Sequence, residues 1–345
     1  MKALCYHGPE DVRYEEVRDA RIEDDADVLV RMTRCGICGS DLHIYHGHVP
    51  LEGCPSIGHE AIGEIVEVGR AVRRFRTGDK IMLSAMVGCG LCDPCRSGHM
   101  LRCARGQMSG YGYGMGLAGC QAEAIRVPMA DFNAAPIPDG MTDDQALLLT
   151  DNLPTAYAAC KRADIVPGAT VGIIGLGPIG LLAVKLAQAM GAGLVVAIDV
   201  KPEKRVLAEA LGAVAFGPEE ATAQVAALTR GAMLDSVVEA VGGSATVDLA
   251  LRLVGRMRTV SVLGNGTQTR IDFPPDRFMY GINFHVMYAT EVWRYWPELV
   301  PLVLAGRLRP EEVVTHSFPL AVGADAYARY AARMDGMLKP VLVPA

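Results

Sequence analysis

Residues 170–190 read TVGIIGLGPIGLLAVKLAQAM, and this stretch decides the fold of the chain. An apolar run typical of a strand, TVGII, passes into the glycine-rich GLGPIG and then into an amphipathic helical pattern. This context turns a weak G-x-G-x-x-G match into a specific prediction of dinucleotide binding, because the glycines allow a tight turn and close approach to a pyrophosphate at the helix N-terminus. The residues expected to contact the cofactor here are Gly175, Gly177, Pro178, Ile179 and Gly180.

Asp199 ends the next apolar strand, LVVAID, at the distance expected for the acid that binds the adenosine ribose. A carboxylate there accepts hydrogen bonds from the ribose hydroxyls and repels a 2′-phosphate, which favours NAD over NADP. Lys204 is also expected at the cofactor, and with Arg205 it keeps NADP open as the alternative. A second alternative is a structural glycine turn in which Asp199 only caps the following helix.

The sequence on either side of this motif predicts two domains, as the length of 345 residues also does. Downstream, strand-like and helical patterns alternate, which predicts a parallel sheet covered by helices. Upstream, short β-type runs punctuated by glycine and proline predict an antiparallel, partly barrel-like domain. These upstream runs include DVLVRM at 27–32, AIGEIVEVG at 61–69 and KIMLSAMV at 80–87.

Composition excludes several classes of protein. The chain has 33 Lys and Arg against 39 Asp and Glu, a formal charge of −6, so bulk positive charge does not attract it to nucleic acid. Half of the residues are hydrophobic and 21% are charged, as in a globular protein. The N-terminus lacks the pattern of a secretory leader, so we expect a cytoplasmic protein with reduced thiols and no membrane partner.

Four of the ten cysteines are clustered as Cys89-x2-Cys92-x2-Cys95-x7-Cys103. Four thiolates are the ligand set of a closed, structural zinc site, which has no open position for catalysis. The alternatives are a zinc ribbon that contacts nucleic acid through nearby arginines, and an iron–sulfur cluster.

A dispersed set of metal-ligand residues consists of Cys38 in GICGSDLH, His59 in GHE and Asp151 in LTDNLPTAY. Three ligands of this kind leave one position open, as in catalytic zinc sites. Each residue taken alone also fits a buried thiol, a satisfied histidine or a helix cap.

The segment 58–72, GHEAIGEIVEVGRAV, together with GICGSD, the clustered cysteines and GLGPIG, closely resembles the zinc-dependent medium-chain alcohol dehydrogenases. The resemblance covers nearly the whole chain. It implies an α/β protein with a GroES-like antiparallel β-barrel catalytic domain, a Rossmann doubly wound parallel sheet, and an active site in the cleft between them. The expected domains are 1–152 with a structural zinc lobe at about 89–103, 153–287 for NAD, and 288–345 returning to the catalytic domain.

The resemblance also implies two zinc ions per chain, with Cys38, His59 and Asp151 holding the catalytic one. Asp151 departs from the commoner cysteine and is similar to the secondary-alcohol and glutathione-independent formaldehyde dehydrogenase branches, as is MADFN at 129–133. Glu60 matches the glutamate behind the zinc. Asp41 matches the acid that orients the zinc histidine.

The activity implied is NAD-linked, reversible oxidation of small to medium primary or secondary alcohols to aldehydes or ketones. Zinc serves as the Lewis acid, and hydride passes to the nicotinamide. Ser40 and His43 match the relay that carries the hydroxyl proton to solvent, although Ser40 as a helix cap and His43 as a surface residue are the alternative. Thr155 matches a position beside the nicotinamide ring, and Lys339 is expected to reach the pyrophosphate.

Rival functions within the family are a polyol dehydrogenase and a formaldehyde dehydrogenase or dismutase. A catalytically silent protein that binds NAD(H) and zinc is the alternative outside the enzyme class. The partner expected is a small alcohol or aldehyde, with assembly into a homodimer or homotetramer through an edge strand at 284–290.

Overall fold

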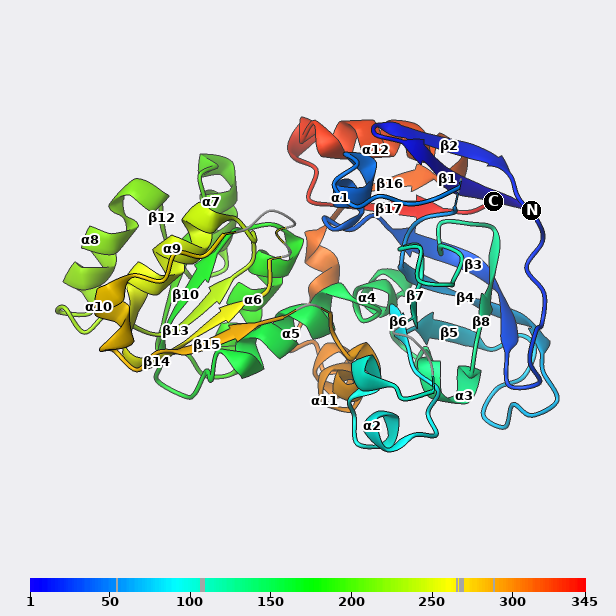
Figure 1. The fold of residues 1–345 in the computed structure, drawn as a ribbon, viewed down its shortest axis with the longest axis horizontal. Helices are drawn as coiled ribbons and strands as arrows, with labels where there is room; N and C mark the ends of the chain where they lie inside the picture. Colours follow the sequence, from blue (N-terminus) through cyan, green and yellow to red (C-terminus); the bar gives the residue numbers. More distant parts are fainter. Residues whose placement is uncertain (54, 106–108, 265, 267–269, 288) are drawn as a thin grey trace. The chain divides into compact units, whose positions relative to one another are not determined.

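The chain divides into two compact units in the computed structural model, which describes residues 1–345 except 54, 106–108, 265, 267–269 and 288 (Figure 1). Unit 1 consists of Met1–Pro154 and Ala289–Ala345, and unit 2 consists of Thr155–Tyr288. No helix in the described part of the chain is long and apolar enough to cross a membrane.

Unit 2 is a six-stranded parallel sheet with helices between its strands. Its elements are α5 (Asn152–Arg162, which starts in unit 1), β10 (Thr170–Ile174), α6 (Pro178–Ala189), β11 (Leu194–Ile198), α7 (Pro202–Ala210), β12 (Val214–Phe216), α8 (Pro218–Leu228), β13 (Leu234–Glu239), α9 (Ser244–Leu253), β14 (Val254–Val262), α10 (Pro275–Phe278) and β15 (Asn283–Val286).

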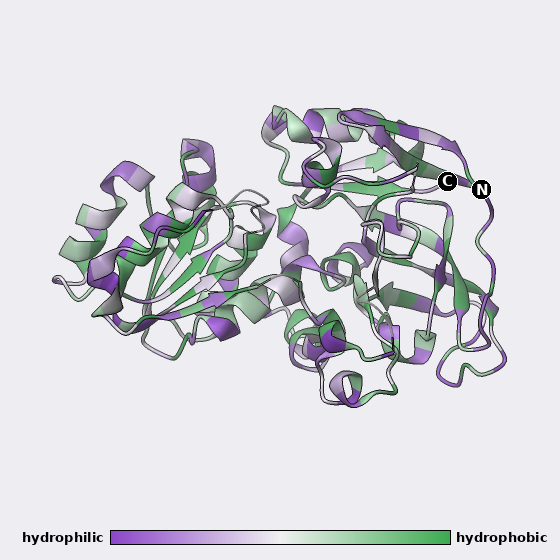
Figure 2. Cartoon of the chain, in the orientation of Figure 1, coloured by the Kyte–Doolittle hydropathy of each residue, from purple (hydrophilic) through white to green (hydrophobic). Residues whose placement is uncertain are grey.

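The strand order in unit 2 is β12-β11-β10-β13-β14-β15, the doubly wound order with its switch point at β10. Helices α6 and α7 contact each other, as do α8 and α9, so the two pairs flank the sheet. The inner strands are continuous apolar runs because both of their faces are covered, and Figure 2 shows hydrophobic residues concentrated on them. The βαβ prediction and the α/β fold class are therefore confirmed.

Unit 1 is mainly antiparallel, with a seven-stranded sheet and two small two-stranded sheets. Its strands are β1 (Lys2–Gly8), β2 (Asp11–Glu16), β3 (Val28–Gly36), β4 (Glu60–Val68), β5 (Lys80–Leu83), β6 (Met86–Val87), β7 (Ser109–Gly110), β8 (Ala124–Val127), β9 (Ala134–Pro136), β16 (Val314–Pro319) and β17 (Lys339–Val343). Its helices are α1 (Asp41–Tyr45), α2 (Asp93–Arg96), α3 (Ala130–Asn133), α4 (Asp143–Leu148), α11 (Val292–Leu304) and α12 (Gly323–Ala331), with short 3-10 turns at Met100–Arg102, Pro310–Val313, Leu320–Val322 and Met334–Gly336.

The large sheet of unit 1 joins both ends of the chain, since β17 pairs with β3 and β3 pairs with β4. One predicted strand, 80–87, is divided into β5 and β6, which belong to different sheets. The sequence reading also missed α11, because Pro297 and Pro301 lie inside it. Its buried residues include Leu299 and Val303, so packing of its apolar face outweighs the two prolines.

Candidate active site and metal centres

Four ligand-type side chains from separate parts of unit 1 converge at one place. Cys38 follows β3, His59 precedes β4, Glu60 begins β4, and Asp151 lies between α4 and α5. One ligand atom of each lies within 4.8 Å of the others. The Asp151 Oδ2 atom is 3.8 Å from the Cys38 Sγ atom and 3.6 Å from the His59 Nε2 atom. We call these four residues the mixed cluster.

The spacing of the mixed cluster fits a zinc ion. Tetrahedral zinc with bonds of about 2.0–2.3 Å places two ligand atoms roughly 3.3–3.8 Å apart, close to the distances found here. Cys38 and His59 are each 6% exposed, so they present a buried thiol and imidazole of the kind that zinc prefers. Cys38, His59 and Asp151 are thus able to hold a zinc ion.

Asp41 positions two members of the mixed cluster. It is fully buried at the first position of α1, and its Oδ1 atom lies 3.1 Å from the His59 Nδ1 atom. Its other oxygen accepts a hydrogen bond of 2.9 Å from the Cys38 backbone amide. Contact with Asp41 through Nδ1 leaves the His59 Nε2 atom for a metal.

Glu60 lies between two buried partners. The Lys339 ammonium forms an ion pair with Glu60 Oε2 and donates a hydrogen bond of 3.1 Å to the Ile37 carbonyl. The Asn152 side chain donates to Glu60 Oε1 at 2.9 Å and to Asp151 Oδ2 at 3.3 Å. Lys339 is only 1% exposed and its charge balances that of Glu60, while its expected contact with the pyrophosphate stays a prediction.

Charge and burial shift the pKa values of the mixed cluster in ways that a cation would reverse. Burial and the negative charge of Glu60 raise the pKa of the Cys38 thiol. Burial lowers the pKa of His59, but the charge of Asp41 together with hydrogen bonds to Asp151 and Asp41 outweighs burial, so that this pKa lies well above its usual value. A bound cation favours the thiolate and the neutral imidazole.

Ser40 and His43 lie on one helical turn beside the cluster. Ser40 occupies the N-cap position of α1 without a side-chain capping bond, and its carbonyl accepts a 3.1 Å hydrogen bond from the His43 amide. Ser40 thus stands at the cap position that the alternative expects, but its side chain makes no capping bond. The His43 ring is 5.9 Å from the ring of His48.

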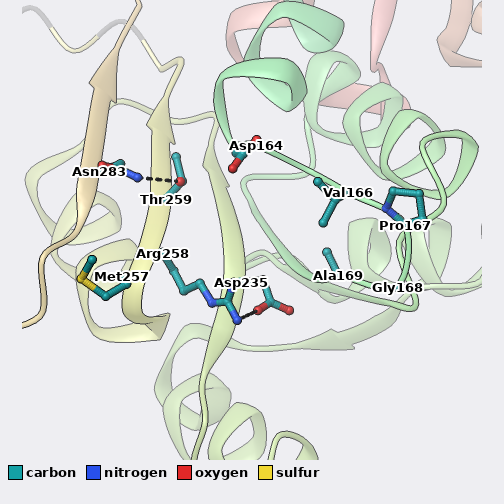
Figure 3. A pocket seen from close by; sticks show the side chains of 10 residues that line it. All are labelled: Asp164, Val166, Pro167, Gly168, Ala169, Asp235, Met257, Arg258, Thr259 and Asn283. Atoms are coloured by element: carbon teal, nitrogen blue, oxygen red, sulfur yellow. Dashed lines mark hydrogen bonds and ion pairs between the residues drawn. The ribbon is translucent and has the colours of Figure 1, made fainter.

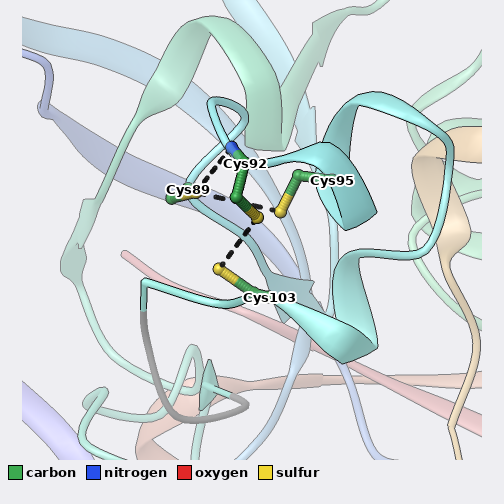
Figure 4. A group of neighbouring side chains, drawn as sticks. All are labelled: Cys89, Cys92, Cys95 and Cys103. Carbon is green, nitrogen blue, oxygen red and sulfur yellow. Dashed lines mark hydrogen bonds between the residues drawn. The ribbon is translucent and has the colours of Figure 1, made fainter.

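A second cluster, the four-cysteine lobe, consists of Cys89, Cys92, Cys95 and Cys103 (Figure 4). The Sγ atoms of Cys89 and Cys95 are 4.0 Å apart, as are those of Cys92 and Cys103, close to the spacing of zinc thiolates. Backbone amides of Leu91 and Cys92 donate to the Cys89 sulfur, and Ala104 donates to the Cys92 sulfur, each at 3.4 Å. The lobe therefore fits a structural zinc ion.

The glycine motif of unit 2 lies at the end of β10 and the start of α6. Gly175 has φ +90°, and a Cβ atom there meets Val241 at 2.4 Å. A Cβ atom on Gly180 lies 1.8 Å from the Gly175 carbonyl oxygen, so only glycine fits. Gly177, the N-cap of α6, has open space where a Cβ would be. The turn thus leaves room for a phosphate at the helix N-terminus, as dinucleotide binding requires.

Asp199 lies just after β11, where it braces the glycine motif. Its two carboxylate oxygens accept hydrogen bonds from the backbone amides of Leu176 at 2.8 Å and Lys201 at 2.9 Å. Arg205 donates to the Asp199 carbonyl at 2.9 Å. Asp199 therefore has a structural role at the start of α7, and its remaining lone pairs are free to accept ribose hydroxyls.

The other expected cofactor residues occupy helices: Thr155 is buried on α5, and Lys204 is on the first turn of α7.

A pocket in unit 2 adjoins residues such as Ala169, at the amino end of β10 (Figure 3). An ion pair of 2.9 Å between Asp235 and Arg258 lies on its wall. Dinucleotides bind at the carboxyl ends of parallel strands, so this pocket differs from the glycine-motif site.

Three site residues were missed by sequence reasoning. The Asn152 side chain donates a hydrogen bond to Glu60, and the only feature of the sequence that points to Asn152 is its position directly after Asp151. The Trp296 indole donates a 2.8 Å hydrogen bond to the Leu149 carbonyl and so braces the segment that carries Asp151. The ring of Tyr113 lies 5.2 Å from that of His59. Tyr113 stands in the glycine-rich segment 109–119, SGYGYGMGLAG, which carries no metal-ligand motif.

Comparison with known proteins agrees with this geometry. The family model "Alcohol dehydrogenase GroES-like domain" matches residues 24–139, and the model "Zinc-binding dehydrogenase" matches residues 178–305. A Mycobacterium tuberculosis protein named a probable zinc-binding alcohol dehydrogenase is 40% identical, over 100% of this chain and 89% of its own length.

Solved structures show the same likeness. The alcohol dehydrogenase of Thermus sp. ATN1 is 34% identical, with a TM-score of 0.94 and 100% of both chains covered. A zinc-binding dehydrogenase of Sinorhizobium meliloti bound to NADP is 27% identical, with a TM-score of 0.86 and 99% of both chains covered. This chain therefore belongs to the zinc-dependent, medium-chain alcohol dehydrogenase family of oxidoreductases.

Proposed function

We propose that this protein is an NAD-dependent dehydrogenase of small to medium primary or secondary alcohols, which it converts reversibly to aldehydes or ketones. The observation that carries the proposal is the buried mixed cluster, in which thiol, imidazole and carboxylate converge at zinc-ligand distances. On this proposal unit 1 is the catalytic domain and unit 2 is the dinucleotide-binding domain.

Cys38, His59 and Asp151 are proposed to hold the catalytic zinc, and the four-cysteine lobe a structural one. When bound, the catalytic zinc supplies Lewis acidity, which lowers the pKa of an alcohol that reaches it. Asp41 fixes the orientation of His59 through a 3.1 Å contact. The ligand side chains are thus held in position before zinc and substrate bind, and such preorganisation favours catalysis.

Ser40 and His43 are proposed to move the hydroxyl proton. Ser40 has one proton to donate and two lone pairs to accept with, so its oxygen takes the alcohol proton while its own proton leaves. His43 is partly exposed on the next turn of the backbone, where it is able to pass a proton to solvent.

The glycine motif, Asp199, Lys204 and Thr155 are proposed to bind the dinucleotide. NAD, when bound, supplies the nicotinamide that accepts hydride. The open space beside Gly177 admits the pyrophosphate, and the Asp199 carboxylate disfavours a 2′-phosphate in the same place. NADP in the Sinorhizobium meliloti relative makes this preference worth a direct test.

The experiment is a screen of NADH formation by the zinc-loaded protein with primary, secondary, aromatic and polyol substrates, run in parallel with NADP. We expect turnover of one alcohol group with NAD. Asp151→Asn keeps the shape of the ligand but removes its charge, so we expect it to lower both zinc content and rate. Asp144→Asn, in the same segment but outside the cluster, is the control. No oxidation of any alcohol by protein with full zinc content would contradict the proposal.

A second arm tests the cofactor. Asp199→Asn removes the charge that repels a 2′-phosphate. We therefore expect the ratio of kcat/KM for NAD to that for NADP to fall by roughly tenfold, the size of effect expected when one contact between charged groups is lost. Asp164→Asn, an acid elsewhere in unit 2, is the matched control. An unchanged ratio would show that another residue sets the preference.

A further inference from the structure

Three histidines lie close together at the end of α1, outside both metal clusters. The rings of His43 and His48 have their centres 5.9 Å apart, and so do the rings of His46 and His48. The backbone closes this turn tightly, because the His48 amide donates a 2.8 Å hydrogen bond to the His43 carbonyl. The His46 amide donates one of 2.9 Å to the Leu42 carbonyl. We call His43, His46 and His48 the histidine trio.

The turn between β1 and β2 fixes the position of His46. Gly47 turns the chain at φ +74°, and a Cβ atom there would meet the Pro9 ring at 2.7 Å. The Glu10 amide donates a hydrogen bond of 2.6 Å to the Tyr45 carbonyl, and the Glu10 carboxylate lies 3.4 Å from the His46 Nδ1 atom. The buried ring of Tyr45 packs edge-on against His46 at 5.3 Å. A carboxylate at Nδ1 is the arrangement in which a protein histidine presents Nε2 to a metal.

The spacing of the histidine trio suits a transition-metal ion. Tetrahedral zinc with bonds of about 2.0–2.1 Å to two imidazoles places their ring centres roughly 5 Å apart. The rings here are slightly farther apart, and His46 and His48 are exposed, so rotation about their side-chain bonds brings them into range. Imidazole is a preferred ligand of zinc and copper, whereas magnesium and calcium prefer oxygen.

The trio includes His43, the residue that the proposed function uses to pass a proton to solvent. A neutral imidazole accepts a proton through the lone pair of one ring nitrogen. A metal ion bound to that lone pair prevents proton acceptance. Metal on the histidine trio would therefore block the exit of the relay at a place outside the mixed cluster.

We infer that the histidine trio is a third metal site, which binds a zinc ion more weakly than the two clusters do and inhibits the enzyme. The binding follows from the trio alone, whereas the inhibition rests on the proposed function. Glu10 supports the site through His46, as Asp41 supports His59 in the mixed cluster. The site is weaker because it has no thiolate, and because exposed side chains lose rotational freedom when they bind.

The test is a calorimetric titration of the zinc-loaded wild type with zinc chloride, run beside the rate of alcohol oxidation at each zinc concentration. We expect a third equivalent of zinc to bind and to lower kcat/KM by roughly tenfold or more, because a proton acceptor is lost. Magnesium chloride at the same concentrations controls for ionic strength and should neither bind nor inhibit.

His46→Gln removes one ligand that has no part in the proposed catalysis. We expect it to weaken binding of the third zinc ion by roughly 100-fold or more, since loss of a mere supporting partner costs about 10- to 100-fold. Its rate without added zinc should equal that of the wild type. Glu10→Gln should weaken binding by about tenfold. His285→Gln, at an exposed histidine of β15, is the matched control.

Absence of a third zinc equivalent in the wild type would overturn the inference. Equal zinc affinity in His46→Gln and the wild type would also overturn it, as would equal weakening in His285→Gln. Zinc binding that His46→Gln abolishes, but that leaves the wild-type rate unchanged, would overturn the effect on His43. If the wild type oxidises no alcohol, the proposed function falls, while the calorimetry still decides whether the zinc site exists.

Discussion

The four-cysteine lobe takes all its ligands from the segment 89–103, whereas the mixed cluster joins Cys38 to Asp151 across 113 residues of sequence. The lobe is held by backbone amides of its own neighbours, such as Leu91 and Ala104. The mixed cluster is held by distant side chains, with Lys339 reaching the Ile37 carbonyl across 302 residues.

This difference in construction predicts what the loss of one ligand does in each cluster. Four thiolates close the coordination of a zinc ion, so removal of a thiolate from the lobe disturbs local structure. In the mixed cluster, one thiol, one imidazole and one carboxylate leave a position for a ligand from outside, so removal of one affects chemistry first.

The largest contrast is expected between Cys38→Ser and Cys92→Ser. Cys38→Ser should lower kcat/KM by roughly 10³-fold or more, because Lewis acidity is worth several kcal/mol of transition-state stabilisation. Cys92→Ser should mainly lower the Tm. Both are checked by steady-state rates, thermal melts and zinc content. Equal loss of Tm in the two variants would contradict the division between chemistry and structure.

Lys339→Met tests whether the mixed cluster depends on long-range charge balance. It leaves Glu60 buried without its cation, and we expect it to cost about 3–5 kcal/mol of unfolding free energy. The double variant Lys339→Met, Glu60→Gln should recover most of this loss, because no buried charge then remains. Chemical denaturation of the wild type, Lys339→Met and the double variant measures these unfolding free energies. A double variant as unstable as Lys339→Met would show that packing, and not charge, is responsible.

Asp41→Asn tests the contact that orients His59. Its loss should lower zinc affinity or kcat/KM by roughly 10- to 100-fold, the usual effect of losing such a supporting contact. The lobe should keep its own zinc, so metal analysis should show loss from one site only. Asp131→Asn, a half-buried acid of α3 outside both clusters, is the control. Loss of two zinc ions per chain would contradict the independence of the two clusters.

The smallest effect concerns pH and the lobe. Hydrogen bonds from the Ala104 and Cys95 backbone amides lower the pKa of Cys92 from 9.0 to about 6, whereas burial raises that of Cys95 to about 12. Because the folded-state pKa of Cys92 is depressed, its thiolate contributes stability above the unfolded value, and that contribution is lost as pH falls towards 6.

In metal-stripped protein we therefore expect iodoacetamide to label Cys92 with a midpoint near pH 6, and Cys95 only at much higher pH. Peptide mass spectrometry distinguishes the two cysteines. Labelling of both with one midpoint at the ordinary value for cysteine would show that the backbone hydrogen bonds do not shift Cys92.

By itself, the sequence determined the features that depend on local spacing. The four-cysteine lobe and the GLGPIG turn are encoded within short segments, because their ligands and glycines act through neighbouring backbone. Both βαβ alternation and the fold class also follow from local periodicity, and the comparisons confirm them. The roles assigned to Cys38, His59 and Asp151 came from their ligand chemistry and from the resemblance, and remain predictions.

Only the tertiary structure decided the contacts between residues far apart in the chain. The ion pair between Lys339 and Glu60 is one such contact, because pairing of β17 with β3 brings Lys339 to Glu60. Packing likewise places the ring of Tyr113, from a glycine-rich segment far along the chain, 5.2 Å from that of His59. Nothing in the local sequence encodes these contacts, because burial and strand pairing bring the partners together.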